Sequence, residues 1–270
     1  PENALTGQLF LVNEGDDQSL TVPAADGKMR FWRNTTIATL TQGAVATMPF
    51  HTLGYEWDGD SNNGFRPNGY IELSSNTATV SGKLLDYGSS FGPGSVTHHL
   101  SLYRHPSGAF VFGAGTVQWS WGLDANHDGV SVSTDVRMQQ ATVNLLADMG
   151  AQPATLDVSL TPASASTDAL APTSAITLLV PGTSIAAGST LTIAGTAQEQ
   201  GGGQLAGVEV SVDGGTTWTQ ATGTTNWSYA WTPNAQGTYT LKSRGYDDSG
   251  NMEAPSGSVS VTVTPRACPC

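Results

Sequence analysis

Short apolar runs separated by turn residues fill the segment from Ser174 to Thr264, and this pattern constrains the fold more than any other feature. Apolar and polar residues alternate in Val208–Val212 and again in Val259–Thr264, which Pro265 ends. Period two is the spacing of a strand with one buried face. About six or seven such strands without a helical stretch are typical of an immunoglobulin-like sandwich. We therefore predict an all-β Ig-like domain over residues 174–264.

The preceding segment, residues 1–160, has a mixed pattern that predicts an α+β domain, rich in β-structure and with one clear helix. Hairpin turn residues lie at His105–Gly108, between two apolar runs. The strands that we expect in this segment are Gly7–Val12, Lys28–Trp32, Tyr70–Leu73, His98–Tyr103 and Ala109–Gly113.

The helix is predicted over Asp135–Met149. Apolar residues recur there at three- and four-residue spacing, which gives a helix one apolar face. Asp135 stands where an N-cap is expected, and Gly150 stands where a glycine commonly ends a helix.

Composition changes between these two segments. Residues 161–173 are rich in Pro, Ala, Ser and Thr and have no hydrophobic periodicity, which is typical of a linker. The only cysteines, Cys268 and Cys270, lie within residues 265–270, which resemble the start of a further segment. The opening residues contain no initiator Met and no apolar signal segment, so we expect both ends to be cut from a longer protein.

The balance of charge limits the partners that this protein can have. With 22 acidic and 10 basic residues its formal net charge is −12, so it has no basic surface for phosphates and nucleic acid is excluded. No apolar stretch approaches the ~20 residues of a membrane span.

Low charge, abundant Thr, Ser and Gly, and cysteines only at the edge favour a secreted or cell-surface bacterial protein. Its partners would be other domains of its parent protein.

A calcium loop is one interpretation of the residues around His127. Oxygen ligands at positions 1, 3, 5 and 12, a backbone carbonyl at position 7 and a glycine at position 6 match the spacing of such a loop. The metal ligands would be Asp124, Asn126, Asp128, Val130 and Asp135. The last ligand is Asp rather than the usual Glu, and no good helix precedes the loop. The alternative is a polar turn in which Asp135 only caps the following helix.

Glu56 is the candidate catalytic residue. It lies between Tyr55 and Trp57, which favours partial burial, and a buried carboxylate requires a partner or a metal. His98 and His99 are neighbours and face opposite sides of a strand, so they cannot readily bind one metal together. Either one could still act with His51, His105 or Glu56, or both could be structural.

Three aromatic residues share a strand face in the second domain: Trp227, Tyr229 and Trp231. If they are exposed they could stack on a sugar, so a glycan is a possible partner. Core packing of the same residues is the alternative.

Four blocks of residues 1–160 resemble a known family: PENALTG, LGYEWD, GAGTVQWSWGLD and RMQQATVNLL. They are similar to the C-terminal part of the N,N-dimethylformamidase large subunit. The resemblance implies a glutamine-amidotransferase-like fold and an iron held by two tyrosines and a glutamate. Glu56 is the position matched to that glutamate, with Glu2 as the other candidate. The tyrosine motifs would precede Pro1, so iron is expected only if that upstream region is present.

Residues 171–264 resemble a bacterial Ig-like domain, through Val208–Trp218 and Tyr246–Asn251. Our main hypothesis is therefore a non-catalytic fragment of a secreted multidomain protein, with a structural, presentation or binding role and a stabilising calcium. One alternative is a metal-dependent hydrolase of an amide or a polysaccharide that uses Glu56 with His98 or His99. The other is a carbohydrate-binding module.

Overall fold

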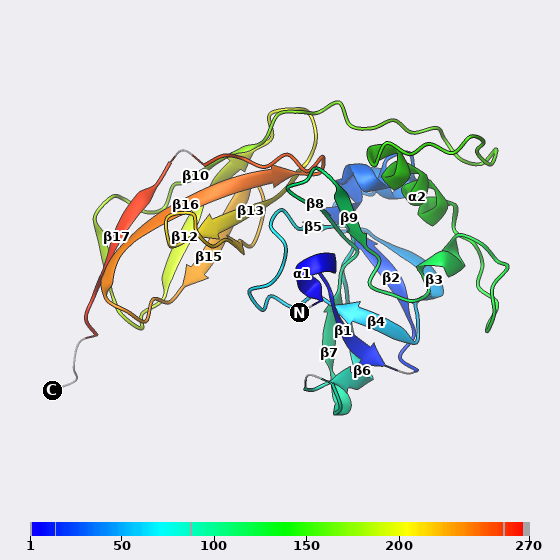
Figure 1. The fold of residues 1–270 in the computed structure, drawn as a ribbon, viewed down its shortest axis with the longest axis horizontal. Helices are drawn as coiled ribbons and strands as arrows, with labels where there is room; N and C mark the ends of the chain where they lie inside the picture. The colour runs from blue at the N-terminus through cyan, green and yellow to red at the C-terminus, as the bar shows by residue number, and fades with distance from the viewer. Residues whose placement is uncertain (1, 14, 87, 256, 267–270) are drawn as a thin grey trace. The chain divides into compact units, whose positions relative to one another are not determined.

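The computed structural model describes residues 2–13, 15–86, 88–255 and 257–266. The chain divides into two compact units, Pro1–Thr167 and Asp168–Cys270 (Figure 1). The division lies inside the Pro-, Ala- and Ser-rich segment 161–173. Cys268 and Cys270, on which we based the expectation of a further segment, lie outside the described residues.

The main sheet of the first unit has the strand order β4-β1-β6-β7. All its neighbouring strands are antiparallel. Its strands are β1 (Leu9–Asn13), β4 (Glu56–Gly59), β6 (Asn76–Leu84) and β7 (Phe91–His98). Two smaller antiparallel sheets complete the unit, with orders β2-β3 and β5-β8-β9. Their strands are β2 (Gln18–Pro23), β3 (Val45–Leu53), β5 (Ile71–Glu72), β8 (Ser101–Arg104) and β9 (Phe110–Gly113).

The predicted helix is confirmed as α2 (Val136–Asp148). The Asp135 side chain accepts a hydrogen bond from the Arg137 backbone N–H, as an N-cap does. After the helix, Gly150 has a φ of 77°, a conformation that glycine adopts without steric cost. The described residues also form the single-turn helix α1 (Asn3–Thr6). Their 3-10 turns are η1 (Asp26–Lys28), η2 (Arg30–Trp32), η3 (Thr36–Thr39) and η4 (Trp119–Gly122).

The predicted strand Lys28–Trp32 is wrong, because this segment contains η2 and the end of η1. Phe31 and Trp32 are both almost fully buried, with their rings perpendicular and 4.8 Å apart. A strand would point these neighbours to opposite faces, whereas a 3-10 turn brings both into the core. Trp32 also donates its indole N–H to the Leu73 carbonyl at 2.7 Å, so its one polar atom is satisfied.

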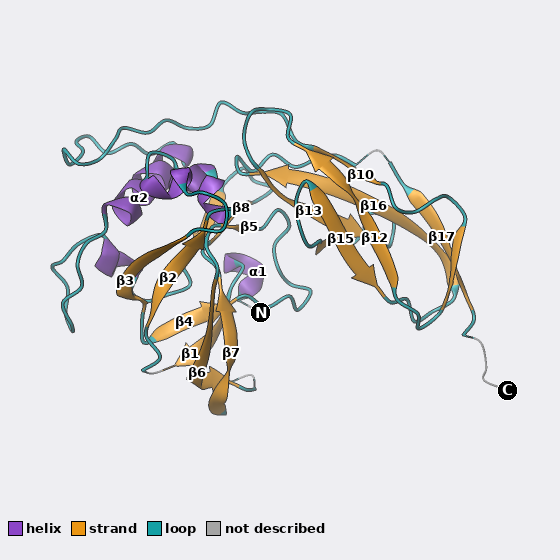
Figure 2. Ribbon diagram, turned by 180° about the vertical axis from the view of Figure 1, so that it is seen from behind, coloured by secondary structure: helices purple, strands orange, loops and turns teal. Residues whose placement is uncertain are grey.

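The second unit consists of two sheets, with orders β10-β12-β15 and β11-β17-β16-β13-β14 (Figure 2). Strands β11 and β17 are parallel, and the other pairs are antiparallel. The strands are β10 (Thr173–Ile176), β11 (Thr183–Ala186), β12 (Leu191–Gln198), β13 (Leu205–Ser211), β14 (Thr219–Gln220), β15 (Asn226–Trp231), β16 (Gly237–Asp247) and β17 (Val259–Thr264). The mixed fold class, with an all-β sandwich after a β-rich domain with one clear helix, is confirmed.

The core of the sandwich contains two of the three aromatic residues that could have met a sugar. Trp227 is 2% exposed and Trp231 is 7% exposed. They pack with aliphatic residues of both sheets, such as Ile193, Val208 and Leu241. The structure thus agrees with core packing, and these tryptophans offer no sugar-stacking surface. In the described ranges, no helix is both long and apolar enough to cross a membrane.

Candidate functional site

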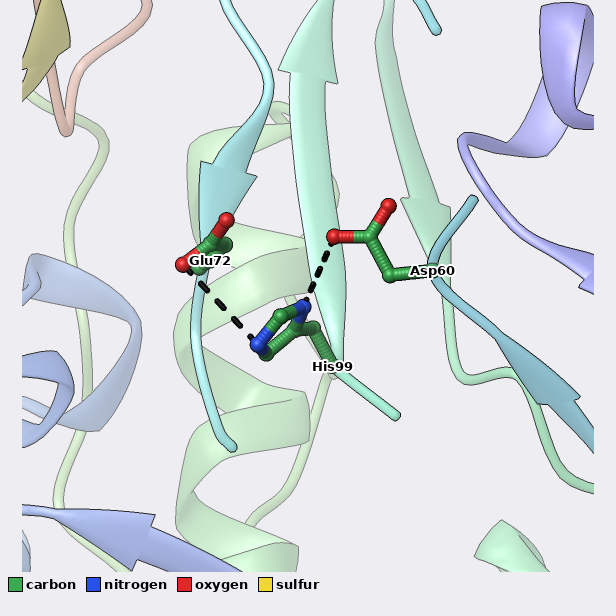
Figure 3. A group of neighbouring side chains, drawn as sticks. All are labelled: Asp60, Glu72 and His99. Atoms are coloured by element: carbon green, nitrogen blue, oxygen red, sulfur yellow. Dashed lines mark hydrogen bonds and ion pairs between the residues drawn. The ribbon is translucent and has the colours of Figure 1, made fainter. Parts of the chain in front are cut away.

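Asp60, Glu72 and His99 converge in the first unit from three distant parts of the sequence (Figure 3). Asp60 follows β4, Glu72 belongs to β5, and His99 lies between β7 and β8. One ligand atom from each residue lies within 4.8 Å of the other two. Two carboxylates and an imidazole at such distances can share protons or bind a cation.

The chain between β7 and β8 decides which histidine enters this group. The predicted strand His98–Tyr103 is in fact divided, because β7 ends at His98 and β8 begins at Ser101. The His98 ring turns into the core, where its Nε2 lies 3.0 Å from the Ala114 carbonyl. Burial lowers the pKa of His98 to about 3, so this ring is neutral at physiological pH. His99 is therefore the only one of the two that reaches the group.

Asp60 holds His99 on one side. Its Oδ2 lies 2.9 Å from the His99 Nδ1, and its Oδ1 accepts from the Arg66 guanidinium. The Asp60 side chain is 4% exposed. Burial acts to raise the pKa of Asp60, but the His99 hydrogen bond and the Arg66 charge outweigh it and lower the pKa. Asp60 is thus a buried, ionised carboxylate that contacts Arg66 and His99.

The other side of the His99 ring faces acidic groups. Its Nε2 lies 3.9 Å from the Glu72 Oε2. Burial acts to lower the pKa of His99, but the Asp60 hydrogen bond and the charges of Glu72 and Asp26 raise it. Burial, followed by the charge of Glu72, raises the pKa of Asp26 to about 6. Asp60 fixes the orientation of His99, so Nε2 is directed toward the acids, the geometry in which histidine transfers a proton or binds a metal.

The sequence did not predict this group, because its members share no local spacing. Of its members, the sequence indicates only His99 as a candidate for chemistry. Only the pairing of Ile71 with Leu102 in β5 and β8, and the end of β7 at His98, bring Glu72 and His99 together.

Glu56 lies elsewhere, at the first position of β4, and is half-buried. It pairs with Asn13 of β1, and its carbonyl accepts from the Val117 N–H at 3.3 Å. Its carboxylate is not part of the group formed by Asp60, Glu72 and His99. Its catalytic role stays a prediction. Glu2, the other candidate, accepts from the Phe10 backbone N–H at 2.7 Å.

The proposed calcium loop follows η4. Asp124 Oδ1 accepts from the Asn126 backbone N–H at 2.8 Å, which closes a local turn. Asp135 accepts from both the backbone and the guanidinium of Arg137. Asp128 and Val130 are exposed. Among the described residues, some acidic, His or Cys side chains form groups of three whose ligand atoms lie within 4.8 Å of one another. None of the acids of this loop belongs to such a group. The calcium assignment stays a prediction.

A second group of acids, also not predicted, lies in the Ig-like unit and comprises Asp168, Glu199 and Asp247. Asp247 is fully buried, and its Oδ1 accepts from the backbone N–H groups of Ser249 and Asn251. Burial is the main cause that raises the pKa of Asp247 to about 6, and the charge of Glu199 adds to it. These acids are far apart in the sequence, so no local motif indicated the group.

Tyr70 and Tyr103 do not fit the tyrosine ligands of an iron held by two tyrosines and a glutamate. Metal-bound tyrosine is deprotonated. Tyr103 donates its hydroxyl to the Leu5 carbonyl at 2.7 Å. Burial raises the pKa of Tyr70 far above its usual range, which opposes deprotonation.

Both units are similar to known protein families. Residues 1–131 match the family described as N,N-dimethylformamidase beta subunit-like, C-terminal. Residues 172–242 match the bacterial Ig domain family. No curated protein matches the chain.

Solved structures with similarity to the chain include fibronectin(III)-like modules of CbhA from Clostridium thermocellum. The identity is 23%, with 36% of this chain and 99% of that chain covered and a TM-score of 0.29. A PKD domain of an M14-like peptidase from a Thermoplasmatales archaeon has 14% identity, covering 34% of this chain and 92% of that chain, with a TM-score of 0.27. The chain is thus similar to the dimethylformamidase beta subunit-like C-terminal family over residues 1–131 and to the bacterial Ig domain family over residues 172–242.

Proposed function

We propose that these two units form a non-catalytic, structural part of a multidomain bacterial protein outside the cell, in which they hold or present other domains. The matches to a C-terminal family region and to an Ig domain support this role. The low content of charged residues, 12% of the chain, is consistent with a secreted or surface protein. A calcium ion at residues 124–135 would add local stability.

The observation that carries this proposal is the pairing of Asp60. One oxygen of its carboxylate accepts from Arg66 and the other contacts His99, so both oxygens are engaged within the protein. The interactions join the segment after β4 to the β7–β8 connection. Breaking a buried ion pair by removing one partner is strongly destabilising. The interactions of Asp60 therefore support a role in stabilising the first unit.

A metal-dependent hydrolase is the second candidate, and the position of the His99 Nε2 opposite Glu72 favours it. The His99 Nε2 and the Glu72 carboxylate face each other, with Asp26 contributing negative charge. Asp60 on Nδ1 would orient the ring, as a carboxylate behind a metal-bound histidine does. In this proposal Glu72 and His99 would hold a divalent cation, and an amide or a polysaccharide would be the substrate.

Glu72→Gln separates the two candidates, because it removes a ligand of the second without changing the contacts of Asp60. The purified protein is tested for formamide and N,N-dimethylformamide turnover and for sugar release from polysaccharides, and its metal content is measured by mass spectrometry. We expect no turnover, and Glu72→Gln should leave the unfolding temperature of the first unit close to that of the wild type. Turnover that Glu72→Gln abolishes, while Asp157→Asn in an exposed turn does not, would replace the structural proposal with the hydrolase.

Localisation is tested separately in the native host. Antibody detection should find the protein in the surface or culture-medium fraction. A protein confined to the cytosolic fraction would contradict the proposed extracellular role without affecting the assignment of the two units.

A further inference from the structure

A pocket of about 380 Å³ lies in the first unit, and its lining does not include Asp60, Arg66 or His99. Its volume is at the lower end of the range for small-molecule sites. The polar and aromatic residues among those that line it are Asp17, His51, Tyr55, Gln118, Trp121 and Asp128.

An irregularity in β3 places His51 beside Asp17. Gln18 of β2 pairs with Leu53, whereas the next residue, Ser19, pairs with Phe50, so the intervening residues of β3 bulge out of the ladder. His51 has a φ of 73°, a left-handed conformation that is strained for a non-glycine residue. The His51 Nδ1 lies 3.1 Å from the Asp17 Oδ2. Bulges with strained residues commonly redirect a side chain at a functional site.

Thr52 holds the bulge in place. Its side chain is fully buried, and its hydroxyl accepts from the Leu20 N–H at 2.9 Å. The same hydroxyl donates to the Pro49 carbonyl at 2.8 Å. The strained position of His51 is therefore built into the fold rather than a property of a loose loop.

Two buried oxygen atoms of the pocket residues accept no hydrogen bond from the described part of the chain. They are the Asp17 Oδ1 and the Gln118 Oε1. Gln118 is 3% exposed. Buried polar atoms are nearly always hydrogen-bonded, so two such atoms in residues that line one pocket indicate a ligand or water that donates to them. Both atoms are acceptors, which requires hydrogen-bond donors on the ligand.

Aromatic rings form another part of the pocket lining. Trp121 stacks on His127, with ring centroids 4.3 Å apart and ring planes 12° apart. This stacking holds the tryptophan in one orientation. Tyr55 is 50% exposed, and Asp128 contributes a carboxylate from the exposed loop after η4. The pocket therefore combines acceptor oxygens with two aromatic side chains.

We propose that this pocket binds one pyranose residue of a glycan. A pyranose has hydroxyl donors at its edge and an apolar C–H face, which match the acceptors Asp17, Gln118 and Asp128 and the rings of Trp121 and Tyr55. The site is distinct from the buried tryptophans of the Ig-like unit. It also does not depend on the structural role proposed for Asp60.

Saturation-transfer NMR with the intact protein tests this inference, using glucose, galactose, mannose, xylose and N-acetylglucosamine as probes. We expect transfer to at least one sugar, with a Kd on the order of 1 mM. Asp17→Asn and Trp121→Ala should weaken that binding at least about fivefold, the effect of about one lost hydrogen bond or ring contact. Asp128→Asn, at an exposed position where misfolding is not expected, should weaken binding too.

Matched controls are Asp157→Asn, in an exposed turn, and Trp218→Ala, a half-buried tryptophan of the Ig-like unit; both should leave binding unchanged. Circular dichroism of each variant verifies folding. Absence of transfer from all five sugars would overturn the proposal. So would sugar binding that Asp17→Asn and Asp128→Asn leave intact. Tetramethylammonium is added as a cationic probe, and binding of this ion in preference to every sugar would also overturn it.

Discussion

Asp60 in the first unit and Asp247 in the Ig-like unit are buried carboxylates with opposite electrostatics. The Asp60 side chain is 4% exposed, and Asp247 is fully buried. In spite of burial, the pKa of Asp60 is lowered, because His99 and Arg66 contact its two oxygens. The pKa of Asp247 is raised to about 6, because burial outweighs the hydrogen bonds that it accepts from Asn251 and Ser249.

This difference shows that burial alone does not set the charge state of an acid. A cationic partner stabilises the ionised form more than neutral amides do. A neighbouring acid has the reverse effect, as Glu199 has on Asp247. The first unit is therefore more stable when Asp60 is ionised, whereas the Ig-like unit is more stable when Asp247 is protonated. Calorimetry that resolves two unfolding transitions would measure both effects in one protein.

The largest effect is expected for Asp60→Asn. This variant keeps the shape of the side chain but removes the negative charge that contacts Arg66 and His99. Loss of one partner from a buried ion pair costs about 3–5 kcal/mol, so the transition of the first unit should move to much lower temperature. Asp157→Asn is the matched exposed control and should change stability by less than about 0.5 kcal/mol. If Asp60→Asn leaves the unfolding temperature of the first unit unchanged, Arg66 and His99 do not require the carboxylate.

Acidification should stabilise the Ig-like unit through Asp247. Its pKa is higher in the folded state than in the unfolded chain, so folding takes up a proton between pH 6 and pH 4. Lowering the pH from 7.5 to 4 should stabilise the Ig-like unit by up to about 3 kcal/mol, at 1.36 kcal/mol per unit of pKa difference.

Asp247→Asn should remove most of this pH dependence from the Ig-like transition, and Glu199→Gln should reduce it. Asp213→Asn is a control in the same unit, because the pKa of that exposed acid is lowered to about 2, mainly by the hydrogen bonds that outweigh its desolvation. An Ig-like unit that loses stability steadily from pH 7.5 to pH 4 would contradict the raised pKa of Asp247.

Calcium is expected to have the smallest effect, through the loop at residues 124–135. Arg137 already pairs with Asp135, so calcium must compete with a bound cation. At ten times its Kd, a ligand stabilises a protein by about 1.4 kcal/mol, which sets the scale for the transition of the first unit. Asp124→Asn should abolish the calcium shift, and Glu199→Gln in the other unit should not. A shift that is confined to the Ig-like transition would contradict calcium binding at the loop.

Local sequence patterns predicted the elements whose formation depends on neighbouring residues. The apolar spacing from Met138 to Leu145, with Asp135 before it and Gly150 after it, predicted α2 to within about a residue at each end. Alternation in Val259–Thr264 predicted β17. Lys28–Trp32 failed because it holds only three apolar residues, and such a short run does not distinguish a strand from tight turns.

The candidate site could not be predicted in the same way. His98 and His99 are adjacent in the sequence and equally available for chemistry. Only the end of β7 decides that His98 is a neutral core residue while His99 meets Asp60 and Glu72. The bulge that directs His51 toward Asp17 likewise depends on how β2 pairs with β3.

The sequence by itself determined the α2 helix and the strands of the Ig-like unit, because periodicity and capping are properties of neighbouring residues. The tertiary structure decided which acids acquired a cationic partner and which remained among other acids. Coulombic interactions and desolvation act over a few ångströms in space, so residues far apart in the chain set the charge of Asp60 and of Asp247 only after folding has brought them together.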